Sequence, residues 1–398
     1  MSKLKELIQE LCPSGVEYQK LGDFVSIYTG TQFNKRDMNV EGNYPVINGG
    51  INPSGYIEQY NEDLDTITIS QGGASAGYVA WQNRKFWAGA HCYVVRPINE
   101  NLSNKYLYFF LKNQEGYLQQ MQHGAGIPAL NRRKVQALQI PIPPLAVQEE
   151  IVKILDRFAE YAAELQAELQ ARQEQYEYYR NKLLIFNNIS GGGGYTGVTW
   201  MKMSEIGTFV RGNGLQKKDF TESGVPCIHY GQIYTHYGTF ATQTKSFVND
   251  ETAKKCKKAH TGDLVFATVS ENIDDVCKCV AWLGDEEICI SGDSLAFCHN
   301  QNPKYLAYYF QTTAFADYKR SKVTGTKVIR LHQSKLEQFV IPIPSLVEQE
   351  RIVSILDKFE TLVNDLSKGL PAEIAAVQEQ YEYYRNKLLS FPKYKLSA

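Results

Sequence analysis

Residues 173–186 read Gln-Glu-Gln-Tyr-Glu-Tyr-Tyr-Arg-Asn-Lys-Leu-Leu-Ile-Phe, and residues 378–391 read Gln-Glu-Gln-Tyr-Glu-Tyr-Tyr-Arg-Asn-Lys-Leu-Leu-Ser-Phe, so that thirteen of fourteen positions are identical. The likeness continues upstream, where Ile-Pro-Ile-Pro-Pro-Leu at 140–145 returns as Ile-Pro-Ile-Pro-Ser-Leu at 341–346. A repeat of this fidelity defines the architecture of a chain. The segments between the copies are far less alike, which indicates one frame written twice around two diverged inserts.

The frame is predicted to form long helices. No Pro or Gly occurs from Gln148 to Phe186, and apolar residues recur there at three- and four-residue spacing. In the second copy, Gly369 and Pro371 interrupt the pattern and predict a kink or a split. An Ile-Pro-Ile-Pro run suits neither a helix nor a central strand, so we expect each run to be an extended lead into its helix.

The two long helices are expected to pack against each other. A single apolar stripe cannot bury itself, so we predict an antiparallel pair that forms a spacer with the inserts at opposite ends. The alternative is that each helix packs only on its own insert. The second copy has four extra residues between Phe359 and Gln378, compared with Phe158 and Gln173. Four residues make about one helical turn, and we interpret them as lengthening the helix by about 6 Å.

The inserts are interpreted as diverged copies of one compact domain. They align near their starts at Gly30 and Gly212, and their middles hold short β-rich runs such as 66–70 and 264–268, separated by turn residues. We therefore predict an α/β fold. It comprises two similar domains separated by long antiparallel, coiled-coil-like helices, with internal duplication and pseudo-two-fold symmetry.

The predicted boundaries follow from these landmarks. They are 1–14 for a short N-terminal helix, 15–139 for the first domain, 140–190 for the first helical spacer, 191–197 for a Gly-rich linker, 198–340 for the second domain, and 341–398 for the second spacer and tail. The glycine run at 191–194 suits a natural flexible joint or an engineered linker, and the sequence leaves both open.

The composition is that of an ordinary globular protein with a net charge of −1. The start lacks the apolar core of a signal peptide, no apolar run approaches membrane-spanning length, and the eight cysteines form no obvious framework. These features lead us to expect a cytoplasmic protein with free thiols and no membrane partner. The inserts carry net charges of +1 and +2 and the frames −3 and −1, so any nucleic-acid contact is expected on the inserts.

Catalytic and cofactor motifs are sparse. The sequence has no Gly-x4-Gly-Lys-Ser/Thr phosphate loop, no Asn-Pro-Pro-Tyr/Phe run and no His-Glu-x-x-His. The Gly-x-Gly pairs at 124–126 and 212–214 suit turns better than a cofactor loop. We predict no catalytic residue and no cofactor in this chain. The spacing of four cysteines fits zinc poorly, so we expect buried strand thiols and no metal site: Cys277, Cys279, Cys289 and Cys298.

Basic, amide and aromatic residues recur at corresponding places in the two inserts. Early lysines and arginines suit phosphate contacts, which fix position without reading sequence, whereas polar side chains on glycine-bearing loops suit base edges. We place Gln71 and Gly72 at a position comparable to 270–272. For each residue taken alone, a solvated surface is the alternative. The candidate DNA-binding residues are Lys35, Arg36, Asn48, Gly49, Gln71, Gly72, Arg132, Arg133, Lys217, Lys218, His229, Tyr230, Gln232, Ser270, Glu271, Asn272, Lys327 and Arg330.

Several organisational motifs occur in a fixed order along the chain. They are the two Ile-Pro-Ile-Pro-x-Leu leads, the two Tyr-Tyr-Arg-Asn-Lys-Leu-Leu helix ends, the openings Leu21-Gly22-Asp23 and Met203-Ser204-Glu205, and the Gly-x-Lys-Val-Ile-Arg stretch near Thr326. With these motifs the chain resembles, over nearly its whole length, the DNA specificity subunit of a type I restriction-modification system. The resemblance implies two target-recognition domains that each read one half of a bipartite, asymmetric DNA site, with a spacer that sets the gap.

The resemblance also implies a division of labour. The specificity subunit has no catalytic centre; it recruits two modification subunits that use S-adenosylmethionine to methylate adenine N6, and restriction subunits add an endonuclease driven by ATP, with Mg expected on the partners. Partner contacts are implied for the helical frame. A duplicated protein-interaction scaffold and a single-chain DNA-modifying enzyme with an unrecognised site are the alternative functions. Four frame tyrosines either bind partners or fill the core, and we favour core filling: Tyr176, Tyr179, Tyr381 and Tyr384.

Overall fold

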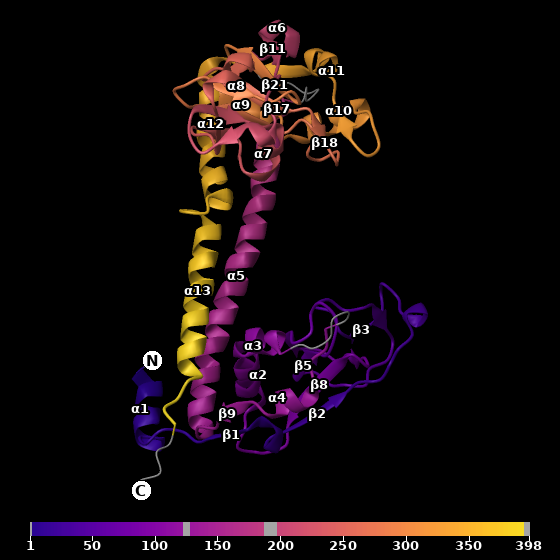
Figure 1. Cartoon of the computed structure of the whole chain (residues 1–398), viewed down its shortest axis with the longest axis vertical. Coiled ribbons are helices and arrows are strands. Elements are labelled where there is room, and N and C mark those ends of the chain that lie inside the picture. Colours follow the sequence, from indigo (N-terminus) through magenta and orange to yellow (C-terminus); the bar gives the residue numbers. More distant parts are fainter. Residues whose placement is uncertain (1, 122–127, 187–196, 394–398) are drawn as a thin grey trace. The chain divides into compact units, whose positions relative to one another are not determined.

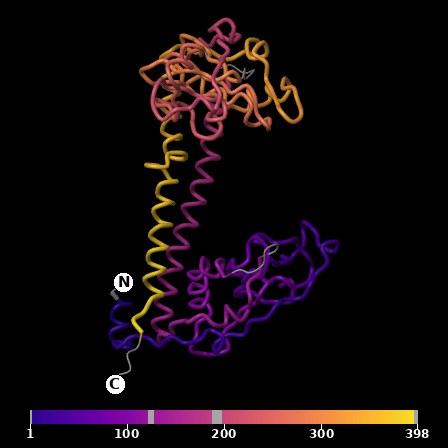
Figure 2. Tube along the Cα trace, in the orientation of Figure 1, coloured from indigo at the N-terminus to yellow at the C-terminus, as the bar shows by residue number. Residues whose placement is uncertain are grey.

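The computed structural model describes residues 2–121, 128–186 and 197–393. The Gly-x-Gly pair at 124–126 and the glycine run at 191–194 lie outside the described residues. The chain divides into two compact units, of which the first comprises Met1–Gln166 with Glu373–Ala398 and the second comprises Ala167–Ala372. Figures 1 and 2 show the chain coloured along the sequence, so the late, yellow helix can be followed into the unit that begins with indigo residues. Each unit therefore combines segments from both sequence copies.

The domain of the first unit is built on two small sheets covered by helices. The larger sheet is antiparallel in the order β2-β8-β5-β6, and the smaller has the order β4-β3-β7 with β3 and β7 parallel. The strands are β2 (Val25–Thr29), β3 (Tyr44–Ile47), β4 (Tyr56–Ile57), β5 (Thr66–Ser70), β6 (Val79–Gln82), β7 (Trp87–Ala88) and β8 (Cys92–Pro97). The helices are α1 (Ser2–Leu11), η1 (Leu21–Asp23), η2 (Lys35–Asp37), α2 (Asn104–Asn113), α3 (Glu115–Gln120) and α4 (Arg132–Gln136).

The domain of the second unit repeats this plan with sheets that have more strands. Their orders are β11-β21-β17-β19-β14 and β12-β15-β13-β20-β16, with a separate pair β18-β22. The strands are β11 (Gly207–Arg211), β12 (Phe220–Thr221), β13 (Val225–Ile228), β14 (Phe240–Ala241), β15 (Ser246–Val248), β16 (Lys258–Ala259), β17 (Leu264–Ala267), β18 (Val269–Ser270), β19 (Cys279–Trp282), β20 (Ile288–Ile290), β21 (Ser294–His299) and β22 (Ile329–Arg330). The helices are α6 (Met203–Ile206), η3 (Lys217–Asp219), α7 (Tyr230–Thr235), α8 (Asp250–Lys255), α9 (Pro303–Tyr309), α10 (Thr313–Lys322) and α11 (Gln333–Gln338).

Two glycines show that the domains share one backbone plan. A Cβ on Gly30 would lie 2.0 Å from the carbonyl oxygen of Ala88, the last residue of β7, and a Cβ on Gly212 would lie 2.7 Å from that of Ile290, the last residue of β20. Neither approach leaves room for any side chain. The alignment of Gly30 with Gly212, made from the sequence, is confirmed by this common contact.

The proline runs are extended, as predicted, and each pairs with the start of its own domain. In the first unit β9 (Gln139–Pro141) lies antiparallel to β1 (Tyr18–Lys20), and in the second β23 (Val340–Ile343) lies antiparallel to β10 (Thr199–Lys202). Both are two-stranded sheets, where each strand has a free edge and tolerates proline. The pairs bring the two ends of each domain together at the entrance to a long helix.

A buried glutamine fixes each of these entrances. Gln148 is fully buried; its Oε1 accepts a hydrogen bond from the backbone N–H of Ser103 at 2.9 Å, and its Nε2 donates to the carbonyl of Pro143 at 2.7 Å. Gln349 is also fully buried and bonds the N–H of residue 302 and the carbonyl of residue 344 in the same way. In each Gln-Glu pair after a proline run, the glutamine is thus buried and bonds the backbone at the start of the long helix.

The long helices differ between the copies. The first copy is one helix, α5 (Leu145–Leu184), whereas the second is split into α12 (Leu346–Asn364) and α13 (Leu370–Leu388). The split predicted from Gly369 and Pro371 is confirmed. The interpretation of the four extra residues as a helical turn is wrong, because the excess forms the non-helical segment 365–369. The Asp365 carboxylate stabilises this turn by accepting bonds from the N–H groups of residues 367 and 368.

Each unit contains an antiparallel helix pair. In the first unit, Phe158 of α5 stacks on Tyr384 of α13 at 5.6 Å, and Tyr161, one turn further along α5, donates to Glu373 near the start of α13. In the second unit, α5 runs against α12, and Tyr176 lies beside Phe359 at 6.2 Å (Figure 1). The start of α5 also enters the core of its own domain. The predicted antiparallel packing is therefore confirmed within each unit, together with packing of the helix on its own insert.

The helix ends with the repeated sequence are exchanged between the units. The first copy, Tyr176–Leu184, lies in the second unit, where Arg180 bonds Gln311 at 3.3 Å. The second copy lies in the first unit, where Arg385 bonds Asn113 at 3.0 Å. Arg180 thus bonds the end of α5 to the second domain, and the equivalent Arg385 bonds the end of α13 to the first domain. Across the described residues, no helix combines the length and the apolar character needed to cross a membrane.

Candidate functional site

In the second domain, the loops after β11, β13 and β20 surround a surface cavity of about 290 Å³. Three of the sequence candidates line or border it: Lys217 is exposed on η3, His229 is the N-cap of α7, and Tyr230 begins that helix. The opposite wall is formed by Ser291, Gly292 and Asp293. The structure therefore brings Lys217 to His229 and Tyr230, which follow it by 12 and 13 residues, and adds the loop 291–293, which the sequence did not indicate.

His229 is held in one orientation by its own helix. Its Nδ1 accepts a hydrogen bond from the N–H of Gly231 at 3.1 Å, and its ring lies against Tyr230 with centroids 4.4 Å apart. Burial lowers the pKa of the imidazole, and the positive charge of Lys217 lowers it further. Because Nδ1 is an acceptor here, the ring proton is on Nε2, which is then a donor available to a ligand.

Asp293 links the cavity wall to the closing segment of the domain. Its carboxylate forms an ion pair with Arg330 at 3.2 Å, and its backbone carbonyl accepts from the N–H of Thr268 at 2.9 Å. Arg330 is half-buried in β22, which pairs with β18. Lys327 is exposed in the turn closed by the bridge between Thr324 and Arg330. Of these two basic candidates, only Arg330 is tied to the cavity wall.

Several candidates of the second domain are used by the fold itself. Gln232 is buried; its Oε1 accepts from the N–H of His229 and its Nε2 donates to Ser246. Asn272 exchanges two hydrogen bonds with Asp275. Ser270 is buried and accepts from the N–H of Asn272. Both ends of each amide are thus bonded within the domain, whereas Glu271 and Lys218 are exposed. The assignment of these residues to DNA contacts stays a prediction.

A buried lysine holds the loop that carries Glu271. Lys319 of α10 is 7% exposed, and its Nζ donates to the carbonyls of Asp274 and Val276. Burial lowers the pKa of this ammonium group. The Asp275 carboxylate bonds Lys278, and this bond lowers the pKa of the carboxylate below its usual range. The loop is thus fixed by charges from within the domain and presents the Glu271 side chain from a defined backbone.

In the first domain, three loops meet through their backbones. Asn48 Oδ1 accepts from the N–H of His91 at 3.0 Å, and the carbonyl of His91 accepts from the N–H of Gln71 at 2.9 Å. A Cβ on Gly49 would lie 2.8 Å from the carbonyl oxygen of Gly72, so these loops touch only because Gly49 has no side chain. Asn48, Gly49, Gln71 and Gly72 are therefore brought together as one surface, and His91 is an exposed member that the sequence did not reveal.

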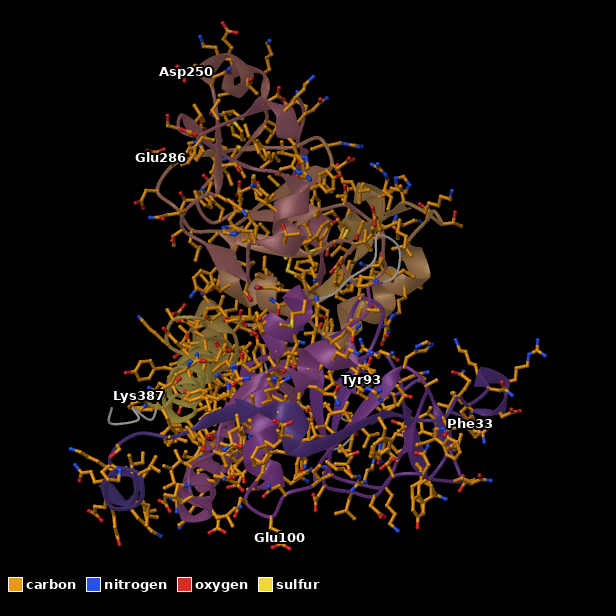
Figure 3. The ribbon with its side chains drawn as sticks, turned by 60° about the horizontal axis from the view of Figure 1, so that its bottom comes forward. Phe33, Tyr93, Glu100, Asp250, Glu286 and Lys387 are labelled. Carbon is orange, nitrogen blue, oxygen red and sulfur yellow. The ribbon has the colours of Figure 1, made fainter. Side chains whose placement is uncertain are left out.

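The basic candidates of the first domain are spread more widely. Lys35 and Arg36 are exposed on η2, next to Phe33, which projects at the edge of the first domain (Figure 3). Arg132 donates to the carbonyl of Ile27 at 3.4 Å and is bound to the outside of β2, and Arg133 is exposed in the first turn of α4. No contact joins these side chains to Asn48 or Gln71 among the described residues.

Strand register corrects one correspondence between the domains. Ser70 pairs with Cys92, and Ala267 pairs with Ser294, so Gln71 corresponds to Thr268. The comparison of Gln71 and Gly72 with 270–272 is therefore wrong by about two residues. By the same register, His91 corresponds to Asp293, since each immediately precedes its strand.

The frame tyrosines lie against phenylalanines. Tyr176 and Tyr179 lie beside Phe359 in the second unit, and Tyr381 and Tyr384 lie beside Phe158 in the first. The Tyr176 hydroxyl also donates to Glu360 at 2.7 Å, and burial, followed by the charge of Glu360, raises its pKa. These contacts support the core-filling role.

The four cysteines considered for zinc are not gathered in one place. Cys277 is buried just before β19, Cys279 is the first residue of that strand, and burial raises the pKa of both thiols. Cys289 packs in a different cluster, with Cys227 and Cys256. Cys298 lies on β21 beside Asp263.

Comparison with known proteins gives a consistent result. The family model described as the type I restriction modification DNA specificity domain matches residues 13–175 and again 195–376. A putative type I restriction enzyme specificity subunit of Haemophilus influenzae is 31% identical, with 95% of this chain and 96% of the relative covered. The specificity subunit of an Escherichia coli type I restriction enzyme is 33% identical over 73% of this chain and 71% of the relative.

Solved structures show the same fold. The S subunit of a type I restriction-modification system from M. genitalium superposes with a TM-score of 0.57 at 17% identity, covering 94% of this chain and 96% of that one. A chain from a study of complex assembly and conformational transition of the type I system gives a TM-score of 0.62 at 17% identity, covering 95% and 98%.

Proposed function

The chain belongs to the type I restriction-modification DNA specificity family, and from this membership we propose that it is the specificity subunit of a complex in which each domain reads one half of a bipartite DNA site. The helical frame sets the gap between the half-sites. We propose further that the chain has no catalytic centre of its own, and that it works in the cytoplasm, where it recruits two modification subunits and the restriction subunits. S-adenosylmethionine, ATP and Mg would then be bound by these partners.

The observation that carries the proposal is the difference between the two domains at corresponding positions. Where the first domain has Asn48 the second has His229, and where the first has His91 the second has Asp293. The backbone around these positions is the same, since both loops follow the parallel strand pairs β3–β7 and β13–β20. An amide, an imidazole and a carboxylate make different hydrogen bonds to base edges. One frame with two chemistries suits two different half-sites.

The test of this function is to coexpress the chain with its modification subunit in a methylation-free host and to map N6-methyladenine by single-molecule sequencing. We expect a gapped, asymmetric motif that appears only when the chain is present. If the partners assemble and no motif appears, the chain is a scaffold. Binding of S-adenosylmethionine by the isolated chain would instead favour a single-chain enzyme.

The exposed lysines of η3 are expected to bind phosphates without reading sequence. In the assembled complex, Lys217→Ala together with Lys218→Ala should weaken binding to all DNA sequences and reduce the slope of log K against log salt by about 2, because each phosphate contact contributes about 0.9. Fluorescence anisotropy at several salt concentrations measures the slope. Lys358→Ala, on the exposed side of α12, is the control. A changed methylation motif with an unchanged slope would contradict the assignment.

A further inference from the structure

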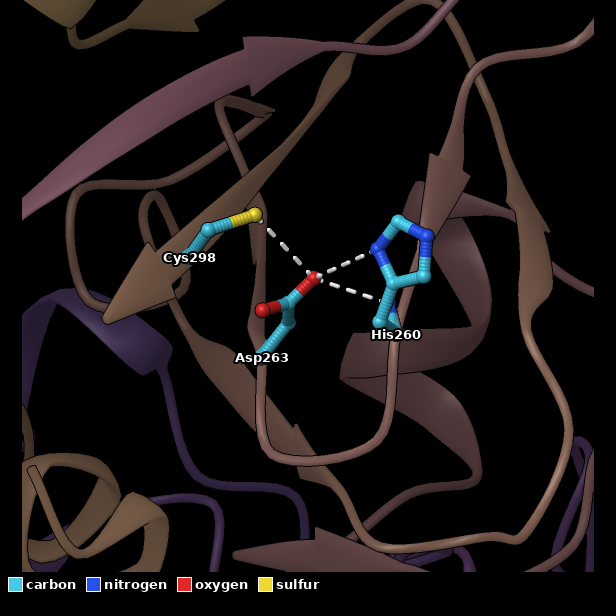
Figure 4. A group of neighbouring side chains, drawn as sticks. All are labelled: His260, Asp263 and Cys298. Atoms are coloured by element: carbon cyan, nitrogen blue, oxygen red, sulfur yellow. Dashed lines mark hydrogen bonds and ion pairs between the residues drawn. The ribbon is translucent and has the colours of Figure 1, made fainter. Parts of the chain in front are cut away.

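The second domain gathers three side chains of the types that bind metals, outside the cavity described above. His260 and Asp263 are at the two ends of the turn between β16 and β17, and Cys298 is on β21 (Figure 4). Asp263 Oδ2 is 3.3 Å from Cys298 Sγ and 3.6 Å from His260 Nδ1. All three donor atoms lie within 4.8 Å of one another.

The backbone presets this arrangement. The turn is closed by the N–H of Asp263 donating to the carbonyl of His260 at 3.0 Å, and Gly262 has a φ of +93°, which glycine adopts without strain. The carboxylate also accepts from the N–H of His260 at 2.8 Å. Leu264 pairs with Phe297 in antiparallel strands. Asp263, which precedes Leu264, therefore lies beside Cys298, which follows Phe297. No change of the fold is needed to bring the donors together.

The first domain places a fixed cation at the corresponding position. Arg96 pairs with Ser26, and Cys298 pairs with Thr208 on the equivalent strand, so the two occupy the same place. The Arg96 guanidinium bonds the buried Glu62 at 2.7 Å. In the second domain, Asp263 is 6% exposed. Among the described residues, the one basic group within ion-pair distance of its carboxylate is the exposed His260. A buried carboxylate requires a compensating positive charge.

The second ring nitrogen of His260, Nε2, also has the kind of partner that is common in metal-binding histidines. His260 Nε2 faces Glu287 Oε2 at 3.6 Å, and Glu287 is held by Lys258 at 3.2 Å. Histidines that bind a metal through one nitrogen usually direct the other N–H to a carboxylate or carbonyl. Glu287 would therefore orient the ring with Nδ1 toward Asp263 and Cys298.

We propose that His260 Nδ1, Asp263 Oδ2 and Cys298 Sγ bind a zinc-type divalent cation, with the fourth position taken by water. Zinc bonds of about 2.3 Å to sulfur and about 2.0 to 2.2 Å to nitrogen and oxygen, at tetrahedral angles, separate the donors by about 3.2 to 3.7 Å. The two separations from Asp263 Oδ2, 3.3 Å to Cys298 Sγ and 3.6 Å to His260 Nδ1, lie in this range, and the third pair is within 4.8 Å. The thiol releases its proton to solvent when sulfur binds the metal, and the cation takes the place that the guanidinium has in the first domain. Its role is to tie the turn to β21.

The experiment measures zinc bound by the full chain after removal of metals with a chelator and addition of a slight excess of zinc. We expect one zinc per chain by elemental analysis after gel filtration, and an increase in Tm on zinc addition. Cys298→Ala and His260→Ala should each abolish both effects, whereas Cys12→Ala, which removes a half-buried thiol in the first unit, should change neither.

A second substitution separates metal binding from folding. His260 is mostly exposed, so its replacement should leave the circular dichroism spectrum unchanged. Glu287→Gln retains all three ligands and should weaken zinc affinity by about 10- to 100-fold. With cobalt as the probe, a sulfur-to-metal charge-transfer band should appear in the wild-type chain and be absent in Cys298→Ala. The proposal is overturned if no zinc is retained, or if the amount bound is the same in the wild-type chain and in the Cys298 and His260 variants.

Discussion

Exchange of residues 198–340 for the corresponding domain of another family member is expected to replace one half of the methylated motif completely and to leave the other half and the gap unchanged. The boundaries are favourable, because β10 and β23 pair with each other and bring the two junctions together. The groups that differ between the domains, such as His229 and Asp293, would move with the exchanged segment. Mapping of N6-methyladenine in the coexpressed complex gives both half-sites and the gap in one measurement.

The reciprocal exchange of residues 15–139 is the matched control and should change the other half only. The segment is bounded in the same way by β1 and β9. A change in both half-sites after either exchange would show that recognition is shared between the domains, and a change in the gap would show that the domains contribute to spacing.

Gln148→Leu is expected to destabilise the first unit by about 3 kcal/mol. The leucine fills a similar volume but leaves the N–H of Ser103 and the carbonyls of Asn101 and Pro143 without their bonds, and each unpaired buried polar group costs about 1 to 3 kcal/mol. Urea unfolding of the full chain measures the loss. Glu149→Leu, at the neighbouring exposed position, is the control and should change stability little.

Gln349→Leu tests whether the two entrances are equivalent. It removes the same kind of bonds in the second unit and should lower stability there by a similar amount. If Gln148→Leu and Glu149→Leu had equal effects, the glutamine would be a surface residue in solution and the entrance would be held by the proline strands alone.

The repeated frame made most of the fold predictable. The apolar spacing in 148–186 predicted α5, and Gly369 with Pro371 predicted the split of the second helix. The four extra residues were misread because their length matches a helical turn, whereas Asp365 folds them into a turn by bonding backbone N–H groups. Periodicity reveals where a helix can continue, but a side chain that competes for the backbone decides where it stops.

The site was predictable only in part, because sequence shows residue types and not their partners. Asn272 has the chemistry of a base reader, yet it bonds Asp275 within its own loop. His91 lies twenty positions from Gln71, and only the strand pairing of β5 with β8 brings their backbones together. Asp263 and Cys298 are neighbours for the same reason, which spacing between cysteines cannot indicate.

The exchange of helix ends affects the order in which the protein is completed on the ribosome. The first unit needs residues from Glu373 onward, and all of Ala167–Ala372 is translated in between. At about 5 to 20 residues per second, this interval is about 10 to 40 s, during which the apolar face of α5 around Phe158 lacks its partner. The second unit has all of its segments once Ala372, near the start of α13, has been added. A nonsense mutation late in the gene would therefore damage the domain that was synthesised first.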